Sequence, residues 1–435
     1  MIYFIGIKGT GMSALACILH DLGYEVAGSD LKKHFFTEEP LVARNIRIDE
    51  FNASNIKDNM TVIIGNAFKN DFCEAKAALE NPSCQCYRYH EFLGELMKDY
   101  STVCVAGSHG KTTTTGMLSS VMNQSKPCGY LIGDGSGYIA SDAQYLCVEA
   151  CEYRRHFLAY HPDYAIITNV EIDHVDYYKS TEDYRLAYEQ FAKNIKKALV
   201  ICGDDSEARK LDLSVKHYWY GLEDNNDFVA KNIIESTTHV EYDVYFENKF
   251  IYHFNLPFVG KHLIYNSLAT IAIGILEGLD CKDIEIGLNH FKGVKRRFVV
   301  EKHGDNIFID DYAHHPTEVK VTIEAAKKRF PDKKLVAIFK PHRVSRVFHF
   351  ANEFASALKL ADKIYLCDFT SIDDKEEGID IDITYLQRLV EGSRVIPEND
   401  EGAKILATEA PCVYLFMSSK DIYGLAELVK RYQKD

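Results

Sequence analysis

The residues most able to do chemistry stand in a glycine-rich turn, Ala106-Gly-Ser-His-Gly-Lys-Thr-Thr-Thr-Thr115. An apolar run precedes this turn and a helical pattern follows it, which is the context in which backbone N–H groups wrap a phosphate. Lys111 would neutralise outer phosphate oxygens, and Thr112 could ligate magnesium. The common Walker pattern has a glycine where this chain has Val105, so the loop is shorter. The pattern predicts binding of ATP-like phosphates with Mg²⁺, rather than a chance glycine turn.

A second glycine turn, Gly6-Ile-Lys-Gly-Thr-Gly11, follows the apolar residues at the N-terminus. Lys8 takes the place of the second glycine of the dinucleotide fingerprint, so the match is not strict. The position still favours a nucleotide whose phosphates lie at the start of a helix. Asp30 stands where an acidic residue could accept a hydrogen bond from a ribose or base. The alternative is a purely structural tight turn.

Polar residues also end two further apolar runs. Glu149 closes one, and Asp173 and His174 follow the run that ends at Thr168-Asn169. The ends of adjacent parallel strands meet at one edge of a sheet, so we expect these side chains beside the phosphate loop. A carboxylate there suits magnesium, whereas histidine is an unusual magnesium ligand. In isolation, His174 would more often be an ordinary surface or core histidine.

Three groups of charged residues occur in the last third of the chain. Arg296 and Arg297 stand at an expected domain junction, from which an arginine could reach a phosphoryl group; a solvated basic turn is the alternative. The segment Asp310-Asp-Tyr-Ala-His-His-Pro-Thr-Glu318 crowds titratable residues at the end of a strand, which rarely serves packing. In Pro341-His-Arg-Val-Ser-Arg346, two arginines could hold a carboxylate in bidentate fashion.

These residues need parallel strands to position them. Short apolar runs alternate with helical patterns along the chain, which is typical of parallel sheets with crossover helices. The sequence predicts an α/β fold of three domains: a Rossmann-like domain at 1–98, a P-loop-type ATPase domain at 99–296 and a Rossmann-like domain at 297–435. The expected strands are 1–5, 24–28, 102–106, 145–148, 164–168, 307–310, 334–339, 364–367 and 413–417. Helices are expected from near Lys111, from near Tyr265 and over 317–328, and a strand-rich stretch over 205–258.

Composition excludes several classes of protein. A formal net charge of −14 over 435 residues disfavours nucleic-acid binding. The twelve cysteines show no metal-finger spacing and are expected to be reduced. No apolar stretch approaches the ~18 residues of a membrane span, so no membrane insertion is expected. We predict a cytoplasmic enzyme that binds small molecules, as a monomer or a homodimer.

With these residues in view, the chain resembles the Mur ligases over essentially its whole length. The double histidine of Tyr312 to Pro316 is similar to the branch that acts on UDP-N-acetylmuramate. The segments that carry the resemblance are Phe4 to Ser13, Gly107 to Thr113, Asn169 with Asp173-His174, Gly260-Lys-His262 with Asn266, Lys295-Arg-Arg-Phe298, Asp311 to Pro316 and Pro341-His-Arg343.

The resemblance implies roles for individual residues. ATP would be bound by Gly107, Ser108, His109, Gly110, Lys111, Thr112, Thr113, Asn266, Arg297 and Asp311. The UDP-sugar would lie near Gly9, Thr10, Gly11, Ser29 and Asp30. The amino acid would be surrounded by Tyr312, His314, His342, Arg343 and Arg346. Magnesium would be held by Thr112, Glu149 and His174, and the catalytic residues would be Lys111, His174, Arg297 and His314.

The implied activity is ATP-dependent joining of L-alanine to the lactyl carboxylate of UDP-N-acetylmuramate through an acyl phosphate, a step of peptidoglycan synthesis linked to cell shape and division. One alternative is a recycling ligase that adds a tripeptide to the same sugar nucleotide. A nucleotide-binding regulator without catalysis is another. A dinucleotide-dependent oxidoreductase is disfavoured, because a phosphate loop with Lys-Thr has no role in hydride transfer.

The chain departs from the family's pattern at a few positions. Lys8 replaces a glycine of many members, Leu263 an asparagine, and Ser418-Ser-Lys-Asp421 a glycine-rich turn. Cys151-Glu-Tyr-Arg-Arg155 stands where many members are acidic. None of these departures removes an expected catalytic group.

Overall fold

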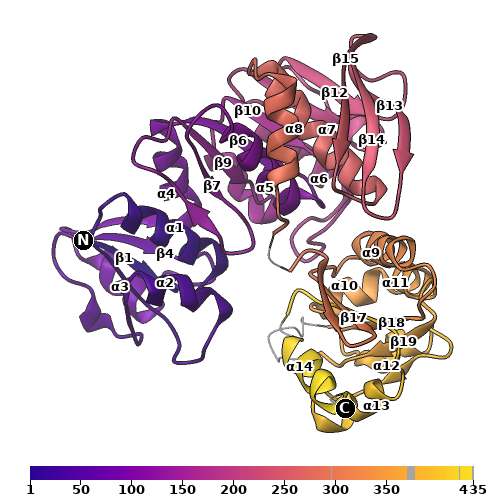
Figure 1. Cartoon of the computed structure of the whole chain (residues 1–435). Coiled ribbons are helices and arrows are strands. Elements are labelled where there is room, and N and C mark those ends of the chain that lie inside the picture. Colours follow the sequence, from indigo (N-terminus) through magenta and orange to yellow (C-terminus); the bar gives the residue numbers. More distant parts are fainter. Residues whose placement is uncertain (295, 370–377, 421, 434–435) are drawn as a thin grey trace.

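The computed structural model describes residues 1–294, 296–369, 378–420 and 422–433, in which the strands form three sheets (Figure 1). Each sheet belongs to one of three consecutive parts of the chain, which confirms the predicted α/β class and the three-domain architecture. In Figure 1 the N-terminal domain lies at the left, the central domain at the upper right and the C-terminal domain at the lower right. Lys295 and Asp421, named above, lie outside the described residues.

The N-terminal sheet is entirely parallel, with the order β3-β2-β1-β4-β5. The second strand was expected at 24–28 but occupies Val26–Ser29, because Gly23 and Tyr24 still cap the preceding helix through hydrogen bonds to His20 and Leu19. The strands are β1 Ile2–Ile5, β2 Val26–Ser29, β3 Arg47–Asp49, β4 Thr61–Ile64 and β5 Gln85–Arg88, and the helices are α1 Thr10–Asp21, α2 Glu39–Ala43, α3 Cys73–Glu80 and α4 Tyr89–Leu96.

The central sheet has a parallel middle and antiparallel edges, in the order β15-β14-β13-β12-β11-β10-β6-β9-β7-β8. The expectation of purely parallel sheets is therefore wrong at both edges: β13, β14 and β15 form a meander, and β8 pairs antiparallel with β7. Short turns join these edge strands, and a short turn permits only antiparallel pairing. The strands are β6 Ser101–Ala106, β7 Cys128–Leu131, β8 Gly137–Tyr138, β9 Tyr145–Glu149, β10 Tyr164–Ile167, β11 Ala198–Cys202, β12 His217–Gly221, β13 Phe228–Glu235, β14 Val240–Phe246 and β15 Lys249–Leu256.

The helices of the central domain are α5 Lys111–Met122, α6 Thr181–Ala192, α7 Lys261–Leu276 and α8 Cys281–His290. Helix α5 begins where the sequence placed it. Helix α7 begins four residues before the predicted start near Tyr265, directly after Gly260, which has φ of +118°. The apolar residues of α7 lie against the central core, which explains why the helix shows little amphipathic pattern.

The C-terminal sheet has the order β16-β17-β21-β18-β19-β20, and among its described strands only β16 runs antiparallel to its neighbour. Its strands are β16 Val299–His303, β17 Asn306–Asp311, β18 Leu335–Phe339, β19 Lys363–Leu366, β20 Arg394–Val395 and β21 Val413–Met417. Its helices are α9 Pro316–Arg329, α10 Val344–His349, α11 Ala351–Leu358, α12 Ile383–Gln387, α13 Asp400–Ala407 and α14 Tyr423–Tyr432. Helix α9 lies between this sheet and the central domain (Figure 1).

The three domains do not join in the same way. One buried apolar cluster runs through both the N-terminal and the central domain, and backbones meet there closely: a Cβ added to Gly137 would lie 2.6 Å from the carbonyl oxygen of Ala14. The buried clusters of the described C-terminal residues contain side chains of that domain alone. The C-terminal domain therefore meets the central domain mainly through polar contacts.

Two expectations from composition can be compared with the structure. Each of the twelve cysteines is free, as predicted for reduced thiols. Among the described residues, no helix is both long and apolar enough to cross a membrane.

Candidate active site

The phosphate loop joins β6 to α5, and its glycines are required by geometry. Gly107 has φ of +130° and Gly110 φ of +82°. A Cβ on Gly107 would lie 2.1 Å from Thr168 Oγ1, so any side chain there would collide with β10's end. Asn169 Oδ1 accepts hydrogen bonds from the amides of Ser108 at 3.0 Å and His109 at 2.9 Å. In the part of the chain that the structure describes, no side chain caps α5, so its first-turn N–H groups can face an anion.

Lys111 lies in the first turn of α5 and points into a ring of acceptors. Its Nζ is 3.0 Å from Glu152 Oε2 and 3.1 Å from the carbonyl oxygen of Ser108, and it also donates to the carbonyl oxygen of Gly107. Burial alone would lower the pKa of Lys111, but the nearby carboxylates of Glu152 and Glu149 outweigh it and raise the pKa. Lys111 is therefore a fixed cation at the start of the helix.

Glu152 was not predicted as a functional residue, yet its carboxylate lies between Lys111 and His174. Its side chain is 1% exposed, and its Oε1 lies 3.6 Å from His174 Nε2. Among the described residues, His174 Nδ1 has no hydrogen-bond partner, and the Glu152 carboxylate is paired with Lys111. An unsatisfied buried imidazole nitrogen is costly, and an imidazole next to a buried carboxylate fits a bound cation.

Glu149, which was expected to hold magnesium, contacts Gly133 and Thr112. Its Oε2 accepts a hydrogen bond from Gly133 N at 2.7 Å, and Thr112 lies within hydrogen-bonding reach. Burial raises the pKa of Glu149, while Lys111 and these hydrogen bonds lower it in part. The structure therefore groups His174 with Glu152 and groups Thr112 with Glu149. The sequence could have indicated Glu152, because it is a second carboxylate only three residues after Glu149, which ends a strand.

His174 has backbone strain of the kind found at functional sites. Its φ is +51°, which is rare for a residue with a side chain, and the ring of Tyr153 packs against its ring at 4.5 Å between centroids. Burial lowers the pKa of His174, although Asp173 and Glu152 oppose this shift. The imidazole is consequently held neutral near pH 7, the form that can accept a proton or ligate a metal.

The two arginines expected to hold an amino acid's carboxylate are paired with aspartates of the central domain. Arg346 Nη2 lies 2.6 Å from Asp173 Oδ1, and Arg343 Nη1 lies 2.8 Å from Asp176 Oδ2. The hydroxyl of Tyr153 also donates to Asp176 Oδ2 at 2.8 Å. In this structure, these arginines link two domains, and their expected contact with the amino acid's carboxylate stays a prediction.

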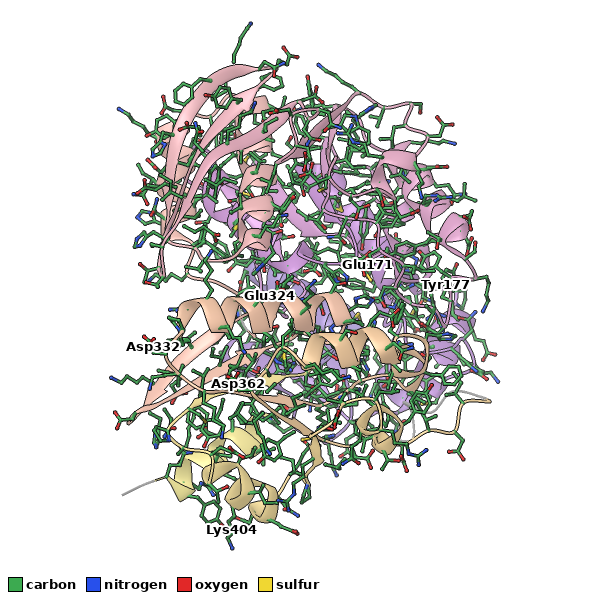
Figure 2. All side chains as sticks on the ribbon, turned by 90° about the vertical axis from the view of Figure 1, so that its right-hand side faces the viewer. Glu171, Tyr177, Glu324, Asp332, Asp362 and Lys404 are labelled. Carbon is green, nitrogen blue, oxygen red and sulfur yellow. The ribbon has the colours of Figure 1, made fainter. Side chains whose placement is uncertain are left out.

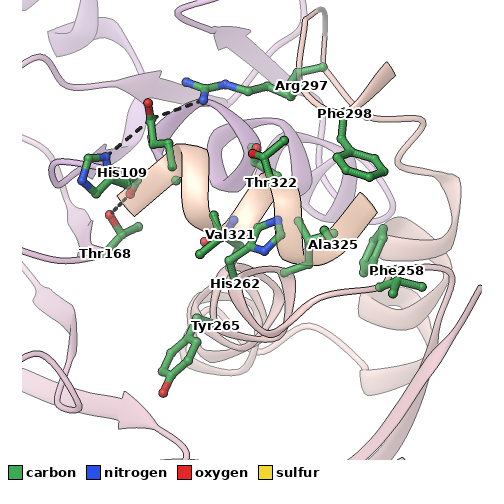
Figure 3. A pocket seen from close by; sticks show the side chains of 18 of the residues that line it. His109, Thr168, Phe258, His262, Tyr265, Arg297, Phe298, Val321, Thr322 and Ala325 are labelled. Carbon is green, nitrogen blue, oxygen red and sulfur yellow. Dashed lines mark hydrogen bonds and ion pairs between the residues drawn. The ribbon is translucent and has the colours of Figure 1, made fainter. Parts of the chain in front are cut away.

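Glu318 joins the phosphate loop to the domain junction. Its Oε1 lies 3.4 Å from Arg297 Nη1 and 3.5 Å from His109 Nδ1, and Figure 3 shows Arg297 and His109 on either side of this contact. Its Oε2 accepts from the amides of His314 and His315 at 3.0 and 3.2 Å. Burial would raise the pKa of Glu318, but the imidazoles and Arg297 hold it well below its usual range. Glu318 belongs to the charged segment 310–318, but the sequence pattern alone indicated no role for it.

A cavity of about 710 Å³ opens between the central and C-terminal domains beside the phosphate loop (Figure 3). Of the residues predicted to bind ATP, the lining includes His109, Gly110, Thr113, Asn266, Arg297 and Asp311. Asp311 Oδ2 accepts from Phe298 N at 2.8 Å and Oδ1 from Ala313 N at 2.7 Å, so this carboxylate also fixes the linker. Burial raises the pKa of Asp311 to about 6.

A second cavity, of about 470 Å³, lies over the N-terminal glycine turn and is lined by Gly9, Thr10, Gly11 and Asp30 of the predicted UDP-sugar site. Lys8 N donates to Asp30 Oδ2 at 2.7 Å, and Lys8 Nζ donates to Leu31 O at 2.9 Å, so this departure from glycine holds the loop beside the cavity. Ser29 does not line the cavity: its hydroxyl is fully buried and donates to Glu74 Oε2.

The remaining predicted amino-acid site lies where β17 and β18 end. Tyr312 has the guanidinium of Arg296 5.0 Å from its ring centroid. His314 Nδ1 lies 2.9 Å from Glu318 Oε2, and burial lowers the pKa of His314. His342 Nδ1 lies 2.9 Å from the hydroxyl of Ser419, and burial lowers the pKa of His342 to about 2.

The departures named above have structural roles of their own. Leu263 packs against the central core, and Arg296 donates to the carbonyl oxygens of Ser418 at 2.7 Å and Ser419 at 3.3 Å. The serine turn is thus held by the junction arginine rather than by glycines.

Comparison with known proteins identifies the family. Three family models match in succession: "Mur ligase family, catalytic domain" at residues 1–101, "Mur ligase middle domain" at 105–274 and "Mur ligase, glutamate ligase domain" at 296–413. The chain belongs to the Mur ligase family. Members of this family are ATP-dependent amide ligases of peptidoglycan synthesis.

Solved structures agree with this Mur ligase assignment. UDP-N-acetylmuramate-alanine ligase MurC from Thermotoga maritima is 28% identical over 99% of both chains, with a TM-score of 0.83. The murein peptide ligase mpl from Psychrobacter arcticus is 23% identical over 100% of this chain and 99% of its own, with a TM-score of 0.75. MurF ligase from Thermotoga maritima, solved in complex with ADP, is 17% identical over 95% and 96%, with a TM-score of 0.63. At 23% and 17% identity, the similarities to the murein peptide ligase and to MurF show that the fold is shared.

Proposed function

We propose that this Mur ligase joins L-alanine to the lactyl carboxylate of UDP-N-acetylmuramate and converts ATP to ADP and phosphate. The main support for a ligase reaction is the cluster of Lys111, Glu152 and His174. It lies beside a cavity that residues of both the central and the C-terminal domains line. The choice of alanine is supported by 28% identity to a MurC over 99% of both chains. The tyrosine and double histidine at Tyr312 to His315 add to this support.

In the first step, an oxygen of the lactyl carboxylate attacks the γ-phosphorus of ATP, and ADP leaves. Lys111 and Arg297 place positive charge where the negative charge of the transferred group spreads. The first-turn amides of α5 hold the phosphate chain, and Asn266, which was expected to bind ATP, lies against Gly110. The product is an acyl phosphate.

Magnesium would be held by Thr112, Glu152 and His174, with Glu149 beside Thr112, and it would supply charge neutralisation at phosphate oxygens. Glu152 is added here to the set of Thr112, Glu149 and His174 expected from the sequence, because its buried carboxylate lies 3.6 Å from His174 Nε2.

In the second step, the neutral amine of alanine attacks the acyl carbon, and phosphate leaves. A base must take a proton from this amine. Burial lowers the pKa of His314, so this imidazole is a neutral acceptor near pH 7, whereas the acceptor nitrogen of His174 would be taken by the magnesium. Contacts between the domains, such as Arg346 with Asp173, would keep water from the acyl phosphate.

The recycling ligase, which would add a tripeptide instead of alanine, is the second candidate. It is favoured by the similarity to the Psychrobacter arcticus murein peptide ligase along the full chain. A cytoplasmic location, a monomeric or homodimeric state and a link to cell division stay predictions of this proposal.

The test measures phosphate release from ATP and Mg²⁺ with UDP-N-acetylmuramate, adding either L-alanine or the tripeptide. Release that needs both UDP-N-acetylmuramate and alanine supports the proposal, and it should vanish in Lys111→Ala. Lys126→Ala is the matched control. Lys126 Nζ lies 3.2 Å from Glu277 Oε2, and neither residue lines the cavity. Release with the tripeptide only would transfer the assignment to the recycling ligase, and no release in any mixture would favour the regulator.

A further inference from the structure

A second group of potential metal ligands lies apart from the cluster of Glu152 and His174. His109, Glu171 and His315 each place one ligand atom so that all three atoms lie within 4.8 Å of one another. His109 Nε2 is 3.0 Å from Glu171 Oε2, and His315 Nδ1 is 4.0 Å from Glu171 Oε1. Ligands of a tetrahedral zinc ion lie about 3.3 Å apart, so small side-chain shifts would complete the geometry.

His315 is the observation that points to a ligand. Its side chain is 1% exposed, and within the described residues neither ring nitrogen has a hydrogen-bond partner. The ring of Phe350 packs at 5.1 Å between centroids and holds the imidazole in place. A buried imidazole without partners is costly unless something else binds its nitrogens.

The surroundings of the other two ligands match those of known metal sites. His109 Nδ1 faces Glu318 Oε1 at 3.5 Å, while Nε2 faces Glu171. Metal-bound histidines usually donate their second ring N–H to a carboxylate in this way. Thr317 Oγ1 donates to Glu171 Oε1 at 2.7 Å and orients that carboxylate.

The three ligands come from two domains. His109 belongs to the phosphate loop and Glu171 follows β10, whereas His315 directly precedes α9 of the C-terminal domain. Figure 2 shows Glu171 at the boundary between these domains. His109 and Glu171 also line the nucleotide cavity, so a further coordination position would open toward water or a phosphate.

We propose that His109, Glu171 and His315 bind a divalent transition ion of the Zn²⁺ class, which ties the phosphate loop to the C-terminal domain. Two imidazoles and one carboxylate suit Zn²⁺ or Co²⁺ better than Mg²⁺, which prefers oxygen ligands. This inference does not depend on the proposed ligase reaction.

The test uses the full-length protein, freed of metals by a chelator and kept in excess Mg²⁺, titrated with Co²⁺ and then with competing Zn²⁺. Visible absorption reports tetrahedral Co²⁺, and the Tm reports the added link between the domains. The variants are Glu171→Gln and His315→Gln. The matched control is His253→Gln, which removes an exposed histidine that also lies between two carboxylates, 2.8 Å from Asp243 and 3.7 Å from Glu241.

We expect one equivalent of Co²⁺ in the wild type and in His253→Gln, and affinity weaker by at least about tenfold in both site variants. Zn²⁺ should raise the Tm of the wild type and of His253→Gln, but not the Tm of Glu171→Gln or His315→Gln. Equal affinity in all four proteins would overturn the proposal, as would a thiolate-to-cobalt charge-transfer band, since that band would assign the ion to cysteines. If His315→Gln does not fold, Glu171→Gln decides, because the Glu171 side chain is 40% exposed and its loss leaves the core intact.

Discussion

Arg346 of the C-terminal domain donates to Asp173 of the central domain at 2.6 Å, and the two residues are 4% and 6% exposed. Asp173 immediately precedes His174, and its Oδ1 also accepts the His174 amide at 2.6 Å. One buried ion pair therefore connects the position of the C-terminal domain to the strained backbone of a candidate catalytic residue.

Removing one partner of this pair should be strongly destabilising. Arg346→Ala leaves the Asp173 carboxylate buried without its cation, which costs about 3–5 kcal/mol. The free energy of unfolding from denaturant titration measures this cost. Lys327→Ala is the control, because the Lys327–Asp362 pair is 42% exposed on both sides and should contribute about 0–1 kcal/mol. Similar losses in the two variants would show that the buried pair has no special role.

Glu152→Gln should reduce phosphate release more than Glu149→Gln. Glu152 lies between Lys111 and His174, whereas Glu149 contacts Gly133, so the first substitution removes the charge that orients both catalytic groups. We expect kcat to fall by at least about 100-fold in Glu152→Gln. Steady-state kinetics over a range of Mg²⁺ concentrations measures this. A larger loss in Glu149→Gln would restore the assignment made from the sequence.

The stability contributed by His109 should depend on pH. Burial would lower the pKa of His109, but hydrogen bonds to Glu171 and Glu318 raise it from 6.5 to about 9. Because the pKa in the folded state is the higher one, this contribution is complete below pH 6.5 and is lost as the pH rises through about 9. It amounts to about 3 kcal/mol at most.

Urea unfolding of the wild type and of His109→Gln, with a chelator present, checks this. The difference in unfolding free energy between the two proteins should shrink from pH 6 to pH 9. A difference that stays constant over this range would show that His109 is not a cation in the folded protein.

Gly107→Ala should disrupt the phosphate loop. Gly107 has φ of +130°, and an added Cβ would lie 2.1 Å from Thr168 Oγ1 and 3.0 Å from Thr168 N. Gly278→Ala is matched, since Gly278 has φ of +76° with nothing within 4 Å of an added Cβ. The control should lose about 1 kcal/mol through backbone strain alone. Gly107→Ala should lose more and should weaken ATP binding in calorimetry; equal effects would exclude a steric role for Thr168.

Much of this protein could be predicted from local patterns. The turn from β6 into α5 was found because glycine, lysine and threonine at that spacing have few other uses, and the strand expected at 413–417 is β21 as observed. The edges of the central sheet were mistaken, because whether a strand pairs parallel or antiparallel depends on its connection and not on its composition.

The sequence by itself therefore determined the α/β class, the three-domain architecture and membership of the Mur ligase family, since these follow from periodicity and motif order. Only the tertiary structure decided which polar groups meet. Glu149 ends β9 and accepts from Gly133, whereas Glu152, in the loop after that strand, meets His174. Likewise, Arg346 met Asp173 across 173 residues of chain, and a linear pattern carries no information on such a distant pairing because only the packing of two domains creates it.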